Sequence, residues 1–309
     1  MSKHVIVGSG PIGSSVAREL VARGESVRMV TRSGSGPAHP LIERIAADAT
    51  DAARLTELTR DAVALYNCAN PKYTQWETLW PPLAGAMLTA AQRTGAVLAI
   101  TGNLYVYGPV PGGRMTENSP LAATGRKGRV RIKMWQDALA SGIRTVDVRG
   151  SDYIGAGASS VFSVSLLPAI AKNRAVWAPA DPDMPHTFTY TGDMGRALVE
   201  LAGDERAWGK GWHVPSQPAI SIRELAARYF EVSGAKPVAI HKLPRFVMRT
   251  AGRFVPMARE LAEMDYQFYA PFHMDSTLTQ RTFGLTPTSL DVALKEVADN
   301  AEATAARKM

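Results

Sequence analysis

The stretch His4-Val5-Ile6-Val7-Gly8-Ser9-Gly10-Pro11-Ile12-Gly13 predicts more about this chain than any other. An apolar run of strand length leads into Gly-x-Gly-x-x-Gly, and apolar residues of helical period follow. In such a strand–turn–helix, the first glycine allows a sharp turn, the second admits a pyrophosphate, and the third packs the helix on the sheet. The helix N-terminus presents free N–H groups to the phosphates. We therefore predict dinucleotide binding at Gly8, Gly10, Pro11, Ile12 and Gly13.

The first half of the chain alternates between predicted strands and helices. This alternation favours a doubly wound parallel sheet with helices on both faces, which is the Rossmann-type α/β fold. The predicted strands lie near 4–7, 26–31, 43–47, 62–67, 96–101 and 144–149, and the helices near 12–23, 51–59, 75–93 and 128–141.

The pattern becomes mixed after Gly150. Asp193 is a candidate N-cap, and Ser221 with Glu224 forms a predicted capping box. We expect a dinucleotide-binding domain over 1–150 and a smaller α+β substrate lobe over 151–309, interleaved with the sheet. Helices are predicted over 160–171, 193–202 and 290–301, and strands over 186–191 and 236–242.

The net charge of +7 lies entirely in the first half of the chain. Residues 1–150 hold 18 Lys and Arg against 11 Asp and Glu, whereas residues 151–309 hold 17 of each. Part of the excess is the cluster over 126–133. A polyanionic cofactor explains this distribution, and because no RNA-binding or helix-turn-helix signature is present, we expect no nucleic-acid partner.

Composition narrows the class of protein further. No apolar run is long enough to span a bilayer, and no signal-peptide pattern begins the chain, so we expect no membrane association. The single cysteine, Cys68, excludes an internal disulfide and fits the cytoplasm. His186, His213 and His273 are scattered without metal-ligand spacing, and we predict no metal site.

Together these motifs resemble the extended short-chain dehydrogenases/reductases, the group of NAD-dependent epimerases and dehydratases. The resemblance covers nearly the whole chain. After the glycine motif, it rests on Asp48-Ala49-Thr50-Asp51, Leu104-Tyr105-Val106-Tyr107-Gly108, Arg149-Gly150-Ser151-Asp152-Tyr153-Ile154-Gly155 and Thr187-Phe188-Thr189-Tyr190-Thr191-Gly192-Asp193. It implies a nicotinamide cofactor, a small-molecule substrate and often a dimer.

The chain departs from this family at its catalytic residues. The resemblance implies Tyr-x-x-x-Lys at the helix after the fifth strand, but no tyrosine lies between Tyr107 and Tyr153. Where Tyr-Gly-x-Ser-Lys is expected, the chain reads Ala123-Thr124-Gly125-Arg126-Lys127, which leaves Lys127 in the lysine's place. The family's Ser or Thr position is Asn103. The lysine-shifted branch, which resembles plant progesterone-5β-reductase, does not fit either, because Leu104 occupies that position. The chain is thus an atypical member by this comparison.

The end of the second strand predicts the choice of cofactor. The carboxylate that would bind the adenosine ribose is replaced by Thr31-Arg32-Ser33, and an arginine there suits a 2′-phosphate. We therefore expect NADP (NADPH), although Arg32 could simply be solvated. By resemblance, Asp48 and Ala49 flank the adenine, while Cys68, Ala69, Ser151 and Lys127 border the rest of the cofactor. Asp48 could equally be a helix cap.

The catalytic candidates are Asn103, Tyr105, Lys127 and Tyr153. Asn103 and Tyr105 alternate to one side of an extended segment, and Tyr153 follows the sixth strand. For each tyrosine the alternative is packing with a bonded hydroxyl, and for Lys127 it is a solvated basic cluster. Three arginines four residues apart suggest either a solvated face or a strip for an anionic substrate: Arg245, Arg249 and Arg253.

We predict an NADP(H)-dependent oxidoreductase that reduces a carbonyl or polarised double bond of a small molecule. The alternatives are an epimerase or dehydratase with transient cofactor redox, and an inert NADP-binding sensor similar to the NmrA-like regulators. A homodimer is expected through the helices at 75–93 and 128–141. The apolar stripe on which this rests comprises Trp76, Leu79, Trp80, Leu83 and Met87, with Val130, Met134 and Leu139 on the second helix.

Overall fold

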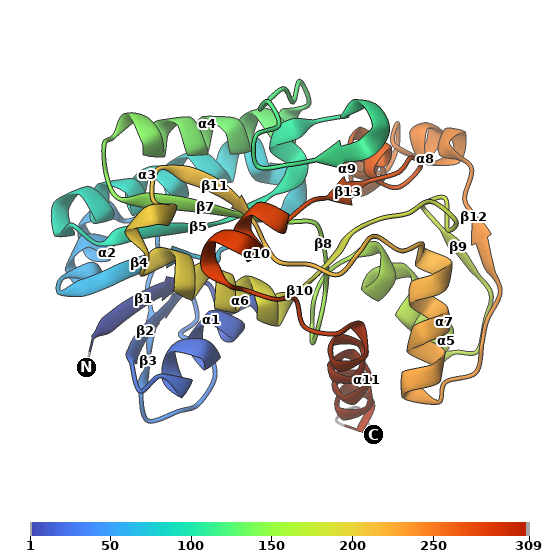
Figure 1. The fold of residues 1–309 in the computed structure, drawn as a ribbon, viewed down its shortest axis with the longest axis horizontal. Helices are drawn as coiled ribbons and strands as arrows, with labels where there is room; N and C mark the ends of the chain where they lie inside the picture. The colour runs from blue at the N-terminus through green and yellow to red at the C-terminus, as the bar shows by residue number, and fades with distance from the viewer. Residues whose placement is uncertain (1, 307–309) are drawn as a thin grey trace. The chain divides into compact units, whose positions relative to one another are not determined.

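Seven parallel strands form the main sheet in a computed structural model that describes residues 2–306 (Figure 1). The spatial order is β11-β7-β5-β4-β1-β2-β3, so the order reverses between β1 and β4. This confirms the predicted doubly wound parallel α/β fold. The strands are β1 (Lys3–Val7), β2 (Ser26–Thr31), β3 (Ile42–Ala46), β4 (Ala62–Asn67), β5 (Val97–Asn103), β7 (Thr145–Gly150) and β11 (Lys210–His213).

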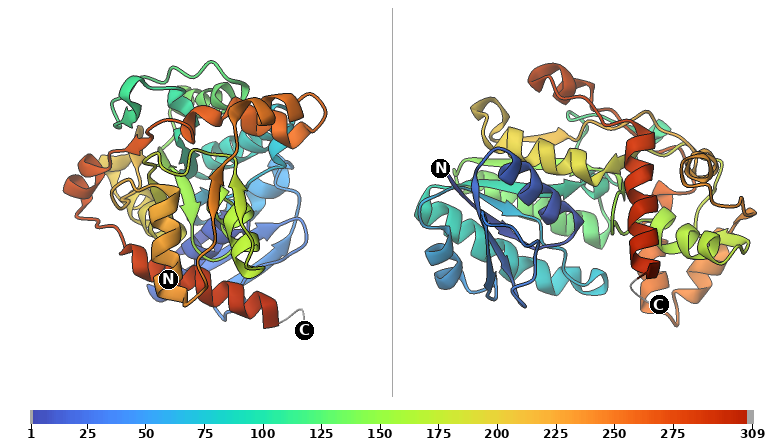
Figure 2. Two further views of the ribbon diagram at one scale, coloured as in Figure 1. Left: turned by 90° about the vertical axis from the view of Figure 1, so that its right-hand side faces the viewer. Right: turned by 90° about the horizontal axis from the view of Figure 1, so that it is seen from below.

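Helices cover both faces of this sheet (Figure 1 and Figure 2). One face carries α1 (Pro11–Ala22) and α6 (Thr191–Ala202), which meet where a Cβ on Gly195 would lie 2.7 Å from Ser15 Cβ. The other face carries three helices, whose apolar sides share one core with β4 and β5. These are α2 (Ala52–Thr59), α3 (Trp76–Thr94) and α4 (Arg126–Ala140).

The chain folds into two compact units, and each unit is built from three separate segments of the chain. The first contains the sheet and consists of residues up to 108, 120–150 and 192–214. The second consists of 109–119, 151–191 and the residues from 215 onward. The chain passes from the first unit to the second after residue 150, where the sequence predicts the domain boundary. Beyond it, α6 and the edge strand β11 belong to the sheet unit.

Within the described residues 2–306, no helix is both long and apolar enough to cross a membrane.

The second unit contains short parallel strand pairs and helices around its own apolar core. The strand pairs are β8 (Asp152–Ile154) with β10 (Phe188–Tyr190), β9 (Val176–Ala178) with β12 (Ile240–Lys242), and β6 (Arg114–Met115) with β13 (His273–Met274). The helices are α5 (Leu167–Ala171), α7 (Ile222–Ser233), α8 (Arg245–Ala251), α9 (Pro256–Glu263), α10 (Thr277–Phe283) and α11 (Leu290–Ala306).

Of the two helix caps predicted in the second half of the chain, one is confirmed and one is wrong. Ser221 and Glu224 form the predicted capping box of α7. The predicted cap Asp193 is wrong, because α6 begins at Thr191 and the Asp193 carboxylate instead accepts a 2.6 Å bond from Arg196. The predicted helix over 160–171 is a π-helical turn followed by α5.

A buried polar network ties β7 to β11 and to the loop after β5. The Arg149 guanidinium donates to the Asp147 carboxylate at 2.7 Å and to the Tyr107 hydroxyl at 2.8 Å. The Tyr107 hydroxyl in turn lies 2.7 Å from Nε2 of His213. All four residues are at most 4% exposed, so each depends on its partners for the hydrogen bonds that water would supply.

We therefore expect Arg149→Met to lower the free energy of unfolding by about 3–5 kcal/mol, because it leaves the Asp147 charge buried and unpaired. Removing both charges in Asp147→Leu/Arg149→Met should recover part of that loss. As a control, Lys133→Met breaks an exposed ion pair with Asp137 and should cost less than about 1 kcal/mol. Chemical denaturation measures all three; equal losses for Arg149→Met and Lys133→Met would contradict this account.

Candidate cofactor and active site

The glycine loop after β1 is shaped by close backbone packing. Gly8 has a φ of +103°, and a Cβ there would lie 2.6 Å from the carbonyl oxygen of Cys68. A Cβ on Gly13 would lie 2.0 Å from the carbonyl oxygen of Gly8. Neither site has room for a side chain, so both glycines are required to hold the start of α1 against the ends of β1 and β4.

Gly10 differs from these two because it borders open space. It is exposed, and no atom outside its immediate chain neighbours lies within 4 Å of the position that a Cβ would take. It is the N-cap of α1, without a side-chain capping bond, and Pro11 and Ile12 follow as the first helical residues. The N-terminus of this 12-residue helix can thus receive an anion, and the residues present fit a pyrophosphate.

The loop after β2 lies beside the glycine loop. The Ser35 hydroxyl is 3.0 Å from the Ser9 hydroxyl, and Thr31 Oγ1 donates to the Ser35 carbonyl at 3.2 Å. Arg32 and Ser33 are exposed there. This loop therefore carries an exposed arginine between two residues with hydroxyl side chains, Thr31 and Ser33.

The segment after β3 shows that Asp48, which the sequence left as a possible helix cap, does not cap α2. The Asp48 carboxylate accepts bonds from the Thr50 amide at 2.9 Å and its hydroxyl at 2.8 Å, and these bonds hold the pKa of Asp48 below its usual value. Asp48 is therefore no helix cap. That role belongs to Asp51, which accepts from the Arg54 amide at the start of α2. Ala49 is buried in the core of the sheet unit.

Cys68 and Ala69 follow β4 directly. The Cys68 amide donates to the Val7 carbonyl at 3.0 Å, which continues the pairing of β4 with β1. Burial raises the pKa of the Cys68 thiol to about 12, so the group is neutral and a weak nucleophile at physiological pH. Both residues lie against the glycine loop, since a Cβ on Gly8 would be 2.6 Å from the Cys68 carbonyl oxygen and 3.0 Å from the Ala69 nitrogen.

The end of β5 is arranged differently from the expectation. Tyr105 does not continue an extended segment, because residues Leu104–Tyr107 form a 3₁₀ turn. The Asn103 side-chain oxygen caps this turn by accepting from the Tyr105 amide at 3.2 Å. The predicted alternation of Asn103 and Tyr105 to one side is thus wrong, although both remain partly accessible at the carboxyl end of the strand.

Two residues of α4 place buried cations against aromatic rings. Lys127 is 2% exposed, and its Nζ lies 4.5 Å from the ring centroid of Tyr73. The Arg131 guanidinium lies 4.8 and 4.4 Å from the rings of Trp76 and Trp80, and donates to the Thr101 carbonyl at 3.1 Å. The alternative of a solvated basic cluster is therefore wrong for both cations.

Sequence reasoning missed Tyr73 and Arg131. Tyr73 belongs to a 3₁₀ turn (Tyr73–Gln75) ahead of α3, and its hydroxyl donates to the Tyr105 hydroxyl at 3.2 Å. The spacing of Tyr73, Trp76 and Trp80 with Lys127 and Arg131 was visible, but only the packing of α3 against α4 brings the two series together.

The remaining candidates lie in the second unit. Ser151 is buried, and its amide donates to Thr189 Oγ1 at 2.9 Å, while Tyr153 belongs to β8 and is half-buried. The proposed anion strip is incomplete, because Arg245 and Arg249 both pair with the carboxylate of Asp265, at 2.7 and 3.4 Å.

Two of the three histidines named in the sequence analysis are buried and in contact with aromatic residues. His186 stacks on Phe268 and Phe272, and burial lowers its pKa to about 4. His213 is part of the network with Tyr107. Across residues 2–306, no group of three or more His, Cys, Asp or Glu side chains is placed to hold a metal ion.

Comparison with known proteins shows which solved structures share this fold. A scan against protein-family models and a search of curated protein sequences each found no match. Solved structures do match over nearly the full length of both chains. The *Bordetella bronchiseptica* enzyme WbmH in complex with NAD+ has 18% identity and a TM-score of 0.76, covering 98% of this chain and 99% of that one.

Two further structures show the same likeness. UDP-glucose 4-epimerase from *Thermotoga maritima*, solved with UDP-glucose, has 15% identity and a TM-score of 0.79 over 98% of this chain and 99% of its own. The dTDP-glucose 4,6-dehydratase DesIV from *Streptomyces venezuelae*, a double mutant solved with NAD, has 18% identity and a TM-score of 0.76 over 99% and 98%. The fold is thus that of the NAD-dependent epimerases and dehydratases, as the sequence resemblance implies.

Proposed function

We propose that this chain is an enzyme that binds a nicotinamide dinucleotide and catalyses an epimerase- or dehydratase-type reaction on a hydroxyl-bearing small molecule. The observation that carries the proposal is the open N-terminus of α1 beside Gly10, with polar groups at the ends of β4, which is the neighbour of β1, and of β5, the next strand along the sheet. The solved structures with this fold support the same choice, since they include epimerases and a dehydratase.

In this proposal, the two ends of the cofactor are held by different segments. Gly8, Gly10 and Gly13 let the start of α1 bind the pyrophosphate, and Asp48 with Ala49 borders the adenine. The nicotinamide ring, when bound, supplies reversible hydride transfer. Cys68 and Ala69 shape the path toward it, Ser151 and Lys127 contribute to its ribose end, and Asn103 orients the substrate. Tyr105 or Tyr153 exchanges the proton.

The start of α4 supports a revised register for the family's catalytic motif. A Cβ on Gly128 would lie 2.6 Å from the Tyr105 carbonyl oxygen, so α4 reaches the end of β5 only with glycine at this position. Matching this glycine to the one in Tyr-Gly-x-Ser-Lys puts Lys127 in the tyrosine's place and Arg131 in the lysine's. On this register the chain carries Lys-Gly-x-x-Arg, and its proton donor comes from another element.

Two other functions remain as proposals of lower rank. A reductase that uses NADPH to reduce a carbonyl would use the same residues, but the hydride would not return to the cofactor. A dinucleotide sensor would use only the residues that bind the cofactor. The lack of a usual tyrosine favours the sensor, whereas the polar groups beyond β5 favour an enzyme. NADP(H) is proposed over NAD(H) because Arg32, with Ser33 beside it, stands where a ribose-binding carboxylate is expected.

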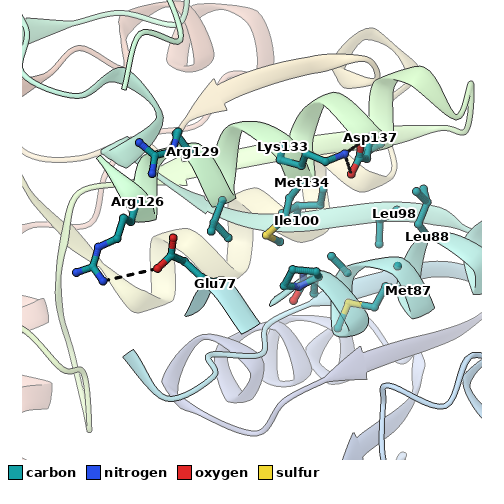
Figure 3. Close-up of a pocket in the computed structure, with 16 residues that line it drawn as sticks. Glu77, Met87, Leu88, Leu98, Ile100, Arg126, Arg129, Lys133, Met134 and Asp137 are labelled. Atoms are coloured by element: carbon teal, nitrogen blue, oxygen red, sulfur yellow. Dashed lines mark hydrogen bonds and ion pairs between the residues drawn. The ribbon is translucent and has the colours of Figure 1, made fainter. Parts of the chain in front are cut away.

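We further propose that the chain forms a homodimer through a groove between α3 and α4. Most of the apolar stripe first used to predict the dimer is buried within the chain, with Trp76, Trp80, Leu83 and Met87 at most 9% exposed, whereas Leu79 and Leu139 are 39% and 43% exposed. The stripe therefore does not form a continuous exposed face, and the proposal uses the groove instead. The groove itself has a volume of about 380 Å³ (Figure 3).

The walls of this groove suit a second copy of the chain. Ala84 has only a methyl side chain and Gly85 has none, so this part of the groove can admit a helix. Leu98 and Ile100 also line the groove. Ion pairs of Glu77 with Arg126 at 3.6 Å and of Lys133 with Asp137 at 2.7 Å mark its rim (Figure 3). A two-fold axis would set acids of one copy against bases of the other, which makes this face complementary to itself.

The reaction type is tested by measuring dinucleotide binding and product formation separately. The wild-type protein should bind NADP or NAD and convert UDP-glucose or dTDP-glucose without net consumption of cofactor, as detected by NMR of the sugar. Gly10→Val should keep the fold, because the site of its side chain is empty, but lose dinucleotide binding. Oxidation of NADPH in proportion to product would favour the reductase, and binding without turnover of any probe would favour the sensor.

Cofactor preference is tested at Arg32. NADPH should bind about tenfold more tightly than NADH, which corresponds to roughly 1.4 kcal/mol. Arg32→Ala should remove most of this difference, whereas Arg18→Ala, at an exposed position on α1, should leave it unchanged. Equal affinities of the unmodified protein for both cofactors would contradict the proposed role of Arg32.

The dimer is tested by light scattering at micromolar concentration, which should give about twice the 33.3 kDa mass of one chain. Gly85→Arg fills the groove at a position where a Cβ meets no atom within 4 Å, so it should yield a folded monomer. Gln92→Arg, an exposed change on the same helix, should remain dimeric. A wild-type monomer would refute the proposal.

A further inference from the structure

A helical hairpin of the second unit lies outside the apolar core of that unit. It consists of α8 and α9, which pack against each other, and a Cβ on Gly252 at the turn between them would lie 3.0 Å from Arg259 Cα. No residue of α8 is buried, and α9 buries only Ala258 and Glu260. Within the part of the chain that the structure describes, no residue of either helix belongs to the core cluster of this unit. Both helices lie at one margin of the unit (Figure 1).

Several large apolar side chains of this hairpin face solvent. Phe246 of α8 is 69% exposed, and Phe254 in the turn is 83% exposed. Val255 and Met257, which follow the turn residue, are exposed as well. All eight phenylalanines of the chain lie in the described residues, and only Phe246 and Phe254 are exposed. Such a concentration of exposed apolar side chains within twelve positions indicates an interaction surface.

The charge of the same stretch has one sign. Residues 242–259 contain five Lys and Arg and no Asp or Glu. Arg245 and Arg249 pair with the Asp265 carboxylate, whose side chain is only 11% exposed, whereas the two arginine side chains are 42% and 64% exposed. The other two arginines of the stretch are exposed, and Glu260, the acid that follows it, is buried. The acids are thus covered while the cations face solvent, so the surface of the hairpin is positive.

A further exposed aromatic side chain lies in the strand pair that leads into the hairpin. β12 pairs with β9, and α8 begins three residues after β12 ends. Trp177 of β9 is 60% exposed, and its ring stacks on His241 of β12 with the centroids 4.8 Å apart. Indole side chains are favoured at the boundary between water and lipid, because one edge is polar and the rest is apolar.

We propose that the α8–α9 hairpin binds the surface of a membrane that contains anionic phospholipids. Its exposed side chains match the two layers of such a surface, since the phenylalanines suit the acyl-chain boundary and the arginines suit the headgroup phosphates. The expectation of no membrane association rests on the lack of a spanning segment, which binding at the surface does not require. The proposal does not use the dinucleotide site, so it stands or fails independently of the proposed function.

Binding is tested by sedimentation of the full-length protein with lipid vesicles. The protein should sediment with vesicles of phosphatidylcholine and phosphatidylglycerol, and it should bind vesicles of phosphatidylcholine alone at least about tenfold more weakly. Added sodium chloride should weaken binding to the anionic vesicles, because it screens the arginines. Equal binding to both kinds of vesicle, or binding to neither, would overturn the proposal.

A matched pair of variants tests whether the hairpin is the surface that binds. Phe254→Glu should lower the affinity for anionic vesicles by about tenfold or more, because it removes an inserted ring and adds a negative charge. Val292→Glu changes the charge by the same amount at an exposed apolar position of α11 and should leave binding unchanged. Both variants should unfold at the temperature of the wild type, since both side chains face solvent. Equal losses in the two variants, or undiminished binding by Phe254→Glu, would refute the role of the hairpin.

A second copy of this chain could also cover an exposed apolar hairpin, and light scattering without lipid distinguishes this case. The mass of Phe254→Glu should equal that of the wild type. A lower mass for the variant would show that the hairpin is a contact between copies and would overturn the membrane assignment. Dinucleotide affinity should be the same in Phe254→Glu and the wild type, so the vesicle result remains decisive even if no sugar nucleotide reacts.

Discussion

The close approach of the chain to itself at the end of β1 is the constraint on which the site depends. With Gly8, Gly13 and the Cys68 carbonyl in contact, the first turn of α1 is fixed against both β1 and β4. Any side chain at either glycine would push the helix away from the sheet. The same contact places the free N–H groups of α1 beside the strand ends that carry the other polar groups. The exposed start of α1 and the arrangement of the strand ends around it thus depend on the same packing contact.

A second feature is that the sheet unit buries three cations, each in a different way. Arg149 is paired with a carboxylate, whereas Lys127 and Arg131 lie against the rings of Tyr73, Trp76 and Trp80. Burial of a charge is costly unless polar or aromatic groups replace water. The aromatic residues of α3, which would suit a protein interface, are used instead to accommodate α4. This explains why an apolar stripe on α3 does not by itself indicate a dimer.

The chain therefore combines the fold of the epimerase and dehydratase structures with a start of α4 that carries no tyrosine. Positions at the start of α4 that face the sheet hold Lys127 and Arg131, and hydroxyl groups come from the turns after β4 and β5. Gly128 lets the backbone of α4 lie against the Tyr105 carbonyl, because a Cβ at this position would be 2.6 Å from that oxygen.

The sequence by itself determined the parallel sheet, the positions of its first strands along the chain and the glycine loop, because apolar periodicity and glycine spacing are local properties. The predicted strands of the first half match β1 to β5 and β7 to within two residues. Asp51 and Asn103 bond amides only two or three residues ahead, but the sequence left these local choices open. The tertiary structure alone decided that β11 completes the sheet. It also decided that Lys127 is buried against Tyr73 and that Tyr73 meets Tyr105. These are contacts between residues 32 to 54 positions apart, and no local pattern encodes which side chains meet when two helices pack over one sheet.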